Sequence, residues 1–430
     1  MLAWCAAAGC FGTVYQNANR TQGVYMAGDI KREDAANEES AVTQPSASDG
    51  AASTEPGTPK RTGGAKKIIV RVLIALVALV VLAVGGIAFM FRGEIATIAS
   101  IKKVNDYPFY TMTYAGDYGI DEFLEQGGAS NDAELIEFVI QHLMKGLPIT
   151  IELPDLACST FNAVTPEGDD IFGRNFDLSY SPSMLVRTDP ENGYASISMV
   201  NLGFLGYGED KLPDSPTSSI TALAAPYAPL DGMNEAGLAV GVLLIDTDPT
   251  NQQTDRVDIT TTTAIRLMLD KCATVDEAIA LLEQYDMHSS ANSCYHFQIA
   301  DASGRTVVVE YIDDELSVLE ANDATTAGAA VEGRTYMAAT NFLLTPGDYD
   351  FGGGQDRYEI VMSGLTAADG VVSEGEAMGL LAACAQETHL NSRGEESATQ
   401  WSVVYNLDDL TATIATGMDY ENTYTVSLLE

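Results

Sequence analysis

Basic residues are scarce in this sequence. Its 430 residues include 22 lysines and arginines against 61 aspartates and glutamates, which gives a formal net charge of -39 at pH 7. A field of this sign argues against binding of nucleic acid or of an anionic membrane surface through the general charge of the protein. The charge favours solubility and leaves the substrate open. The hydrophobic content of 46% is ample for a large buried core.

Cysteine and histidine are also few, and neither occurs at the spacing of a metal site. The sequence contains no phosphate-binding or dinucleotide-binding loop and no internal repeat. We therefore predict that the protein uses no metal and no cofactor. The residues concerned are Cys5, Cys10, Cys158, Cys272, Cys294 and Cys384, with His142, His288, His296 and His389.

Large apolar side chains are almost absent between Asp29 and Lys67, where Ala, Ser, Thr, Glu, Pro and Gly dominate. Such a segment cannot bury enough apolar surface to offset the entropy cost of ordering it. We predict that residues 1–67 form a disordered tail.

A long uncharged run occurs once, from Val72 to Phe91. It has about the 20 residues that a helix needs to cross a hydrocarbon core. A helix that is apolar on all sides is more typical of a membrane span than of a buried core helix. More basic residues precede the run than follow it, which predicts a cytoplasmic N-terminus. We expect a single-pass membrane protein with a transmembrane helix over 68–92 and an extracytoplasmic part from residue 93 onward.

Two β-like runs, Ser159 to Val164 and Ile171 to Phe176, flank a polar turn and predict a β-hairpin. Cys158 opens the first strand. Because the second strand runs back antiparallel beside the first, Arg174 and Asp177 should lie near the sulfur of Cys158. The hairpin therefore brings a thiol, a guanidinium and a carboxylate to one end.

The remaining pattern mixes strands and helices in the manner of an α+β layered domain. A segment over 93–157, with a helix that Asn131 and Glu134 cap, leads into the hairpin. Further strands are predicted at 195–200, 238–245, 295–300, 306–312, 401–406, 411–415 and 423–428, and further helices at 260–272, 275–284 and 374–385.

Cys158 has two simple interpretations. A buried cysteine most often acts as a small hydrophobic residue, and Arg174 with Asp177 could be an ordinary ion pair that closes the hairpin. A thiol beside charged groups is also a candidate nucleophile, and the usual base for a thiol is histidine. A Cys–His dyad remains one alternative, although no papain-type signature surrounds Cys158.

Five motifs follow one another along the chain. They are Cys158, 173–177 (GRNFD), 231–238 (DGMNEAGL), 340–341 (TN) and 399–405 (TQWSVVY). In this order they are similar to a known family, the choloylglycine hydrolases, penicillin V acylases and acid ceramidases, which are N-terminal nucleophile hydrolases of linear amide C–N bonds. The resemblance implies a four-layer αββα domain over 158–430. It also implies cleavage before Cys158, so that the α-amine of Cys158 becomes the base, with residues 93–157 as a propeptide.

The resemblance also implies roles for individual residues. Asp177 would orient the amine and Arg174 would lower the thiol pKa, while Asn341 would supply an oxyanion-hole amide. Leu244 stands where bile-salt hydrolases have asparagine, so its backbone N–H would take that place. Arg357 matches the later active-site arginine of the family, with Arg393 as the alternative.

The expected function is that of a membrane-anchored cysteine amidohydrolase that cleaves an N-acylated small molecule through an acyl-thioester on Cys158. Two alternatives stay open. The same acyl-enzyme could transfer the acyl group to an amine, or the chain could be a tethered binding domain that has lost activity.

Overall fold

The computed structural model describes residues 63–145, 157–321, 335–390, 394 and 396–430. The chain divides into two units, residues 1–71 and residues 72–430. Most of the predicted tail, as well as Arg393, lies outside the described residues.

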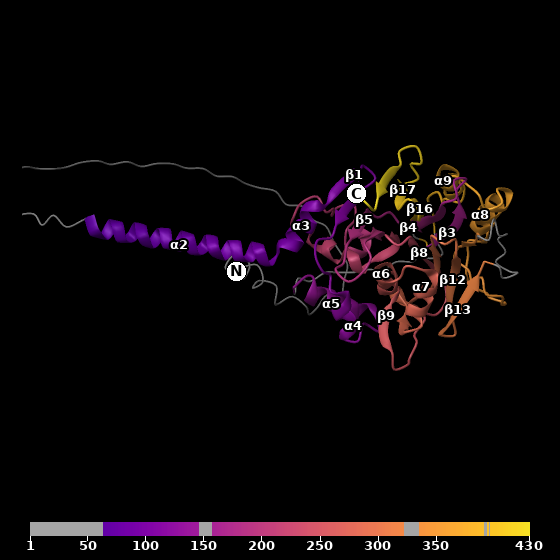
Figure 1. Cartoon of the computed structure of the whole chain (residues 1–430), viewed down its shortest axis with the longest axis horizontal. Coiled ribbons are helices and arrows are strands. Elements are labelled where there is room, and N and C mark those ends of the chain that lie inside the picture. Colours follow the sequence, from indigo (N-terminus) through magenta and orange to yellow (C-terminus); the bar gives the residue numbers. More distant parts are fainter. Residues whose placement is uncertain (1–62, 146–156, 322–334, 391–393, 395) are drawn as a thin grey trace, which may run out of the picture. The chain divides into compact units, whose positions relative to one another are not determined.

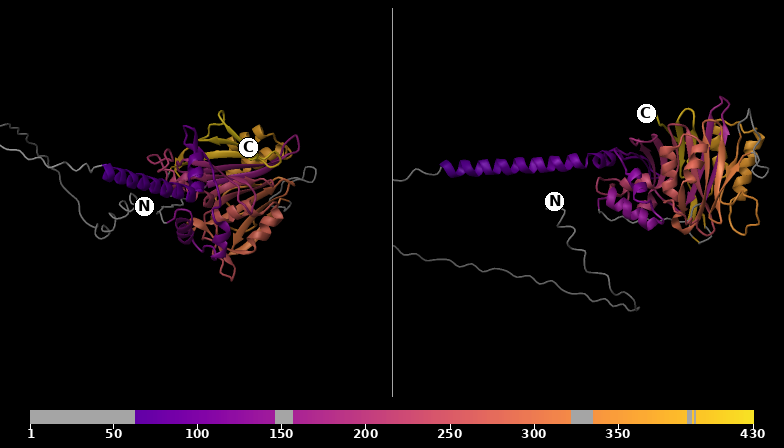
Figure 2. Two further views of the ribbon diagram at one scale, coloured as in Figure 1. Left: turned by 60° about the vertical axis from the view of Figure 1, so that its left-hand side comes forward. Right: turned by 60° about the horizontal axis from the view of Figure 1, so that its bottom comes forward.

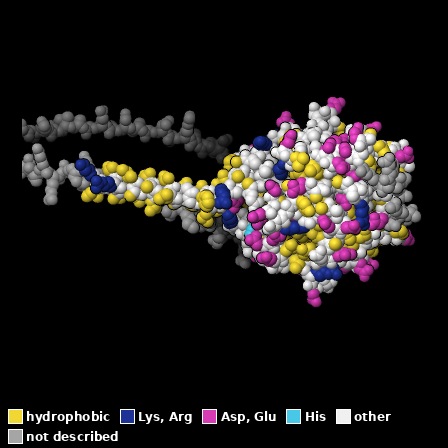
Figure 3. All heavy atoms as spheres, viewed as in Figure 1, with side chains coloured by type: hydrophobic (Ala, Val, Ile, Leu, Met, Phe, Trp, Pro, Cys, Tyr) yellow, Lys and Arg dark blue, Asp and Glu magenta, His cyan; other side chains and the backbone are white. Residues whose placement is uncertain are grey.

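Helix α2 (Gly63–Met90) covers the predicted apolar run. Among the described residues it is the one helix, over Lys67–Met90, whose length and composition would let it cross a membrane. Its large apolar side chains are exposed, among them Leu82 and Phe89, and Figure 3 shows them along the length of the helix. A short helix, α3 (Arg92–Ser100), follows. The orientation across a membrane stays a prediction.

The larger sheet of the second unit has nine strands. All neighbours in it are antiparallel except β2 and β5, which pair in parallel. In spatial order the strands are β1 (Lys102–Asn105), β2 (Phe109–Thr113), β5 (Ser183–Thr188), β6 (Ser196–Asn201), β7 (Pro229–Asn234), β8 (Leu238–Ile245), β11 (Cys294–Asp301), β12 (Thr306–Ile312) and β13 (Glu315–Glu320).

The second sheet has seven strands and contains the predicted hairpin. In spatial order they are β14 (Ala338–Ala339), β3 (Ala157–Val164), β4 (Asp170–Leu178), β16 (Glu396–Asn406), β17 (Thr411–Thr416) and β18 (Tyr424–Ser427), with β15 (His389–Leu390) on β16. A parallel pair, β9 (Val257–Thr260) and β10 (Tyr285–His288), stands apart from both sheets.

The two sheets pack face to face, and each outer face is covered by two helices (Figures 1 and 2). Helices α6 (Thr261–Lys271) and α7 (Val275–Leu282) lie on the nine-stranded sheet, and α8 (Gln355–Ala367) and α9 (Glu374–Ala383) lie on the seven-stranded sheet. This order of helix, sheet, sheet and helix confirms the predicted four-layer α+β class.

The two sheets approach closely at Gly241 of β8. A Cβ atom at this position would lie 2.9 Å from Thr160 Cγ2 of β3 and 3.3 Å from the ring of Phe172. Glycine therefore lets strand β3, which carries Cys158, pack directly against β8. The outer face of the seven-stranded sheet forms a separate apolar cluster with α8 and α9, through Phe161 and Val361.

Helix caps explain several boundaries that the sequence predicts. Asn131 accepts a hydrogen bond from the Glu134 N–H at the start of α5 (Asp132–His142), and Ser373 and Glu376 form a complete capping box on α9. The other helical elements are α4 (Ile120–Glu125) and the 3₁₀ turns at Leu202–Leu205, Ile220–Tyr227 and Ser290–Asn292.

Several elements were not predicted, among them β2, β5, β7 and α8. The segment expected as a lead-in supplies β1 and β2, which belong to the nine-stranded sheet, and Phe109 and Tyr110 of β2 are buried in the main core. The division of the chain at Cys158 stays a prediction. A cut before Cys158 would separate β1 and β2 from the other strands of the nine-stranded sheet.

Candidate active site

Cys158 lies at the start of β3, and its thiol is fully buried. It pairs with Phe176 of β4, and Thr160 pairs with Arg174. Because side chains alternate along a strand, the thiol and Arg174 share the face that packs against β8. Ser159 projects to the opposite face. The hairpin prediction, including the approach of Arg174 to Cys158, is confirmed.

Arg174 is held by a single carboxylate. Its Nε donates to Asp231 Oδ2 at 3.3 Å, and Asp231 also accepts hydrogen bonds from Trp401 Nε1 (3.1 Å) and the Tyr405 hydroxyl (2.6 Å). Asp231 and Arg174 are both fully buried. Among the described residues, no nitrogen or oxygen accepts a hydrogen bond from the two terminal nitrogens of Arg174, so they are available to the sulfur of Cys158.

The thiol experiences opposing effects. Burial raises the pKa of the Cys158 thiol, because the interior disfavours the thiolate, while the positive charge of Arg174 acts to lower it. Asp177 adds to the rise and Arg357 acts against it. A thiolate formed here would therefore depend on Arg174 for its stability.

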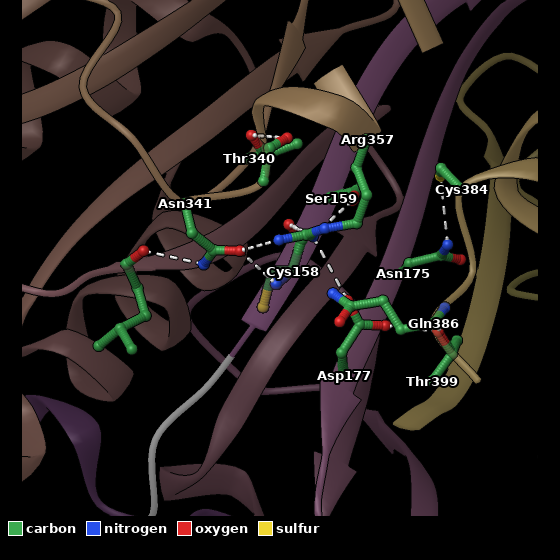
Figure 4. Close-up of polar contacts among 12 residues, drawn as sticks. Cys158, Ser159, Asn175, Asp177, Thr340, Asn341, Arg357, Cys384, Gln386 and Thr399 are labelled. Carbon is green, nitrogen blue, oxygen red and sulfur yellow. Dashed lines mark hydrogen bonds and ion pairs between the residues drawn. The ribbon is translucent and has the colours of Figure 1, made fainter. Parts of the chain in front are cut away.

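The backbone nitrogen of Cys158 meets Asn341, which follows β14. The Cys158 N–H donates to Asn341 Oδ1 at 2.8 Å, and Asn341 Nδ2 donates to the Leu244 carbonyl at 2.8 Å (Figure 4). The N–H and C=O of one strand residue point to the same side, so the Leu244 N–H also faces Asn341. Among the described residues, β7 pairs with β8 only as far as Gly241.

Arg357 reaches the same point from the first turn of α8. Its guanidinium donates to the Cys158 carbonyl, to Ser159 Oγ at 2.9 Å and to Asn341 Oδ1 at 2.7 Å, and lies 3.4 Å from Asp177 Oδ2. Figure 4 shows Arg357 between these groups. The structure thus brings Arg357 to Cys158, whereas the alternative arginine, Arg393, lies outside the described residues.

Asp177 lies on the outer side of the Cys158 backbone, opposite the thiol. It accepts hydrogen bonds from Thr399 Oγ1 at 2.6 Å and Gln386 Nε2 at 3.0 Å, as well as the contact with Arg357. Burial raises the pKa of Asp177, and Arg357 and Thr399 act against that rise. These donors hold the carboxylate, and Arg357 connects it with the Cys158 carbonyl.

Each of the four histidines has partners other than Cys158, which removes support for a Cys–His dyad. His142 contacts Glu122, His288 contacts Asp258 and Asn251, His296 contacts Glu310 and the Thr340 carbonyl, and His389 contacts the Glu387 carbonyl. Cys158, Cys272, Cys294 and Cys384 are free thiols.

Several residues of the site were missed at the level of sequence. Asp231 and Thr399 stand inside motifs that carry the family resemblance, so the motifs themselves were the signal. Gln386 and Ser159 belong to no recognisable motif. Gln386 meets Asp177, and Ser159 meets Arg357, only because α9 and α8 pack on the sheet.

Comparison with known proteins relates part of the chain to a family. Residues 158–329 match the family model of linear amide C-N hydrolases, choloylglycine hydrolase family. No curated protein matches the sequence significantly.

Solved structures with a similar fold include a mutant conjugated bile acid hydrolase from Clostridium perfringens, with 17% identity and a TM-score of 0.45 over 63% of this chain and 92% of that chain. Penicillin V acylase from Agrobacterium tumefaciens has 16% identity and a TM-score of 0.44, over 64% and 87%. The N-acylethanolamine-hydrolyzing acid amidase ortholog from Caenorhabditis elegans has 15% identity and a TM-score of 0.37, over 58% and 93%.

The sequence motifs, the four-layer fold and the family match agree. Residues 158–329 are similar to the choloylglycine hydrolase family of linear amide C-N hydrolases, enzymes that act on carbon–nitrogen bonds other than peptide bonds.

Proposed function

We propose that this linear amide hydrolase cleaves an N-acylated small molecule with Cys158 as its nucleophile, after a cut in its own chain before Cys158. One observation carries the proposal. The backbone nitrogen of Cys158 donates to Asn341 Oδ1, and Arg357 contacts both the Cys158 carbonyl and Asp177. An N-terminal amine at this position would have acceptors already in place.

The cut supplies the base. In the uncut chain the nitrogen of Cys158 belongs to a peptide bond, so it donates a hydrogen and cannot take one. A free α-amine ordinarily titrates at about 7.7–8.0, close to a thiol at about 8.5, and can accept the thiol proton near neutral pH. Asn341 Oδ1 and Asp177 would then accept the amine hydrogens, which leaves the nitrogen lone pair to face the sulfur.

The reaction proceeds in two steps. The Cys158 thiolate, stabilised by Arg174, attacks the amide carbon, and the C–N bond breaks as the protonated amine of Cys158 gives its proton to the leaving amine. Water then hydrolyses the thioester and restores the thiol. The second hydrogen of Asn341 Nδ2 and the Leu244 N–H are the proposed donors to the oxyanion in both steps.

We also propose that α2 anchors the chain in a membrane with the N-terminus in the cytoplasm. The exposed apolar surface of Lys67–Met90 supports this. Resistance of the chain to alkaline carbonate extraction would test the anchor, and protease protection of each end in sealed vesicles would test the orientation. Release by carbonate would contradict the anchor.

The full chain, purified in detergent, tests the catalytic proposal. We expect a fragment whose first residue is Cys158, together with hydrolysis of at least one compound from a panel of bile-salt conjugates, phenoxyacyl penicillins, N-acyl amines and N-acyl amino acids. Cys158→Ala should lose both the cut and the hydrolysis, whereas Cys294→Ser should retain both. An active, uncut polypeptide, or an active Cys158→Ala variant, would refute the proposal.

A further inference from the structure

A buried histidine and glutamate lie behind Asn341, apart from the groups that contact Cys158. His296 of β11 and Glu310 of β12 are both fully buried, and Nδ1 of His296 lies 3.4 Å from Oε1 of Glu310. The two strands are adjacent in the nine-stranded sheet, in the register that pairs Phe297 with Val309. The proposed mechanism gives this pair no role.

The surrounding atoms define the hydrogen bonds of the pair. The Nε2 atom of His296 lies 2.7 Å from the Thr340 carbonyl, which can only accept, so Nε2 carries a hydrogen. Glu310 accepts backbone hydrogen bonds on both oxygens, from Leu344 at 2.7 Å and Thr345 at 3.1 Å. The Nδ1 atom of His296 faces Oε1 of Glu310.

The charge on Glu310 is consistent with its surroundings. Burial by itself would raise the pKa of Glu310, but the hydrogen bond and charge of His296, with the donors from Thr345 and Leu344, bring the pKa below its ordinary value of 4.5. The buried carboxylate of Glu310 thus has protein donors on both oxygens.

His296 and Glu310 contact residues that precede and follow Asn341 in the sequence. His296 holds the carbonyl of Thr340, the residue before Asn341, and Glu310 holds the N–H groups of Leu344 and Thr345, which follow it. Thr340 is also held through its hydroxyl, which donates to the Gly354 carbonyl at 3.0 Å. One rigid pair on the nine-stranded sheet therefore holds the short segment that carries the Asn341 amide.

We infer that His296 and Glu310 are positioning residues that hold Asn341 where its Nδ2 can bind the oxyanion. The inference rests on the proposed function of Asn341. An oxyanion-hole donor acts through its placement, and loss of one such donor typically lowers kcat by about 10²–10³. A loosened donor should cost part of that factor, since the pair touches neither the substrate nor the thiol.

The test separates the oxyanion donor from the thiol. In the full chain, His296→Ala and Glu310→Gln should lower kcat by about 10–100-fold per cut enzyme, with KM within about twofold. Alkylation of Cys158 by iodoacetamide needs no oxyanion hole, so its rate should fall by much less than kcat. His296→Gln, whose amide can donate to the Thr340 carbonyl, should recover part of kcat.

A matched control measures how far the loss of a buried ion pair elsewhere in the domain lowers stability and kcat. Arg266 and Asp270 of α6 form another fully buried ion pair, at 2.8 Å. Asp270→Asn should lower thermal stability with kcat near that of wild type. All variants are compared by circular dichroism at a temperature where they are folded.

Three outcomes would overturn the inference. They are an unchanged kcat in folded pair variants, a loss of Cys158 alkylation in parallel with kcat, and a loss of kcat in Asp270→Asn as large as in Glu310→Gln. If Cys158→Ala keeps its activity, the proposed function is wrong. If Cys158→Ala is inactive and Glu310→Gln keeps the kcat of wild type, only the inference about the His296–Glu310 pair is wrong.

Discussion

At the scale of single residues, the site depends on how Arg174 is neutralised. Asp231 binds the Nε side of the guanidinium, and three donors saturate that carboxylate. The terminal nitrogens of Arg174 are then left for the thiolate. Asp231 thus fixes the direction of the guanidinium and also limits how strongly its charge acts on Cys158.

Replacing Asp231 with asparagine should make Cys158 reactive at lower pH. The asparagine oxygen can still accept from Arg174 Nε, but the negative charge is lost, so the thiolate gains stability and the thiol pKa falls. A shift of about one pH unit, or ~1.4 kcal/mol, is the expected size for one nearby charge. The pH dependence of Cys158 alkylation by iodoacetamide measures it.

Tyr405→Phe is the matched control for Asp231→Asn. It removes one donor to Asp231 and keeps both charges, so its alkylation profile should stay close to that of wild type. Asp177 and Arg357 are the other charged groups near the thiol, and neither is altered. An Asp231→Asn profile that stays in place or moves to higher pH would contradict this account.

Residue-level prediction worked where a local motif carried the chemistry. The hairpin places Arg174 on the same face as the Cys158 thiol, as predicted, whereas Asp177 lies on the opposite face, because it follows Arg174 by an odd number of strand positions. The contact between Glu310 and the 344–345 segment joins residues 34 and 35 positions apart. No periodicity along the chain encodes such a contact, so His296 could be assigned to a strand but given no role.

At the scale of elements, a glycine turn delivers Arg357 to the site. Gly354 caps α8 with φ of +82°, a left-handed conformation. A Cβ atom there would clash with the Arg357 guanidinium and lie 3.1 Å from Thr340 Cβ. Gly353 N–H donates to the Asn341 carbonyl at 2.8 Å, so this turn connects Arg357 with Asn341.

Gly354→Ala should weaken both stability and catalysis. The left-handed backbone alone costs about 1–2 kcal/mol with a Cβ present, and displacement of Arg357 should lower kcat by at least about tenfold if that guanidinium orders the site. Thermal unfolding and steady-state kinetics measure the two effects.

Gly353→Ala is the control for Gly354→Ala. A methyl group at Gly353 would meet no atom of the described residues within 4 Å, and its φ does not lie in the left-handed region. Its stability should stay within about 0.5 kcal/mol of wild type. Equal losses in the two variants would show that the turn tolerates no side chain at either position, and that Arg357 is not the cause.

Elements with strong local signals were predicted, and those set by distant partners were not. The capping pairs at Asn131 and Ser373 mark α5 and α9, and alternation marks β11 and β12. Strand β2 pairs in parallel with β5 across about 70 residues, so its short sequence carries no sign of its partner. Helix α8 begins after three glycines without a side-chain cap.

At the scale of the whole molecule, the proposed cut would fall inside one cooperative structure. Strand β2 precedes Cys158, and β5 follows it, yet the two pair over five residues from Phe109 to Thr113. Phe109, Tyr110 and Met112 are buried in the main core. The core therefore draws on chain from both sides of the cut.

We expect the two pieces to stay together after cleavage. They should migrate as one species in size-exclusion chromatography in mild detergent and separate only under denaturing conditions. Met112→Asp, which places a charge in the buried face of β2, should release the nucleophile-bearing piece or prevent the chain from folding. Spontaneous separation of wild-type pieces at neutral pH would contradict this expectation.

Because β2 pairs in parallel with β5, the two pieces of the chain can stay attached after the covalent bond between them is cut. Once the peptide bond before Cys158 is gone, this ladder of backbone hydrogen bonds and the core packing of β2 would hold the catalytic piece to the piece that carries helix α2. Cleavage would then activate the enzyme without releasing it from the proposed membrane anchor. The enzyme would act only on substrates that reach the bilayer surface.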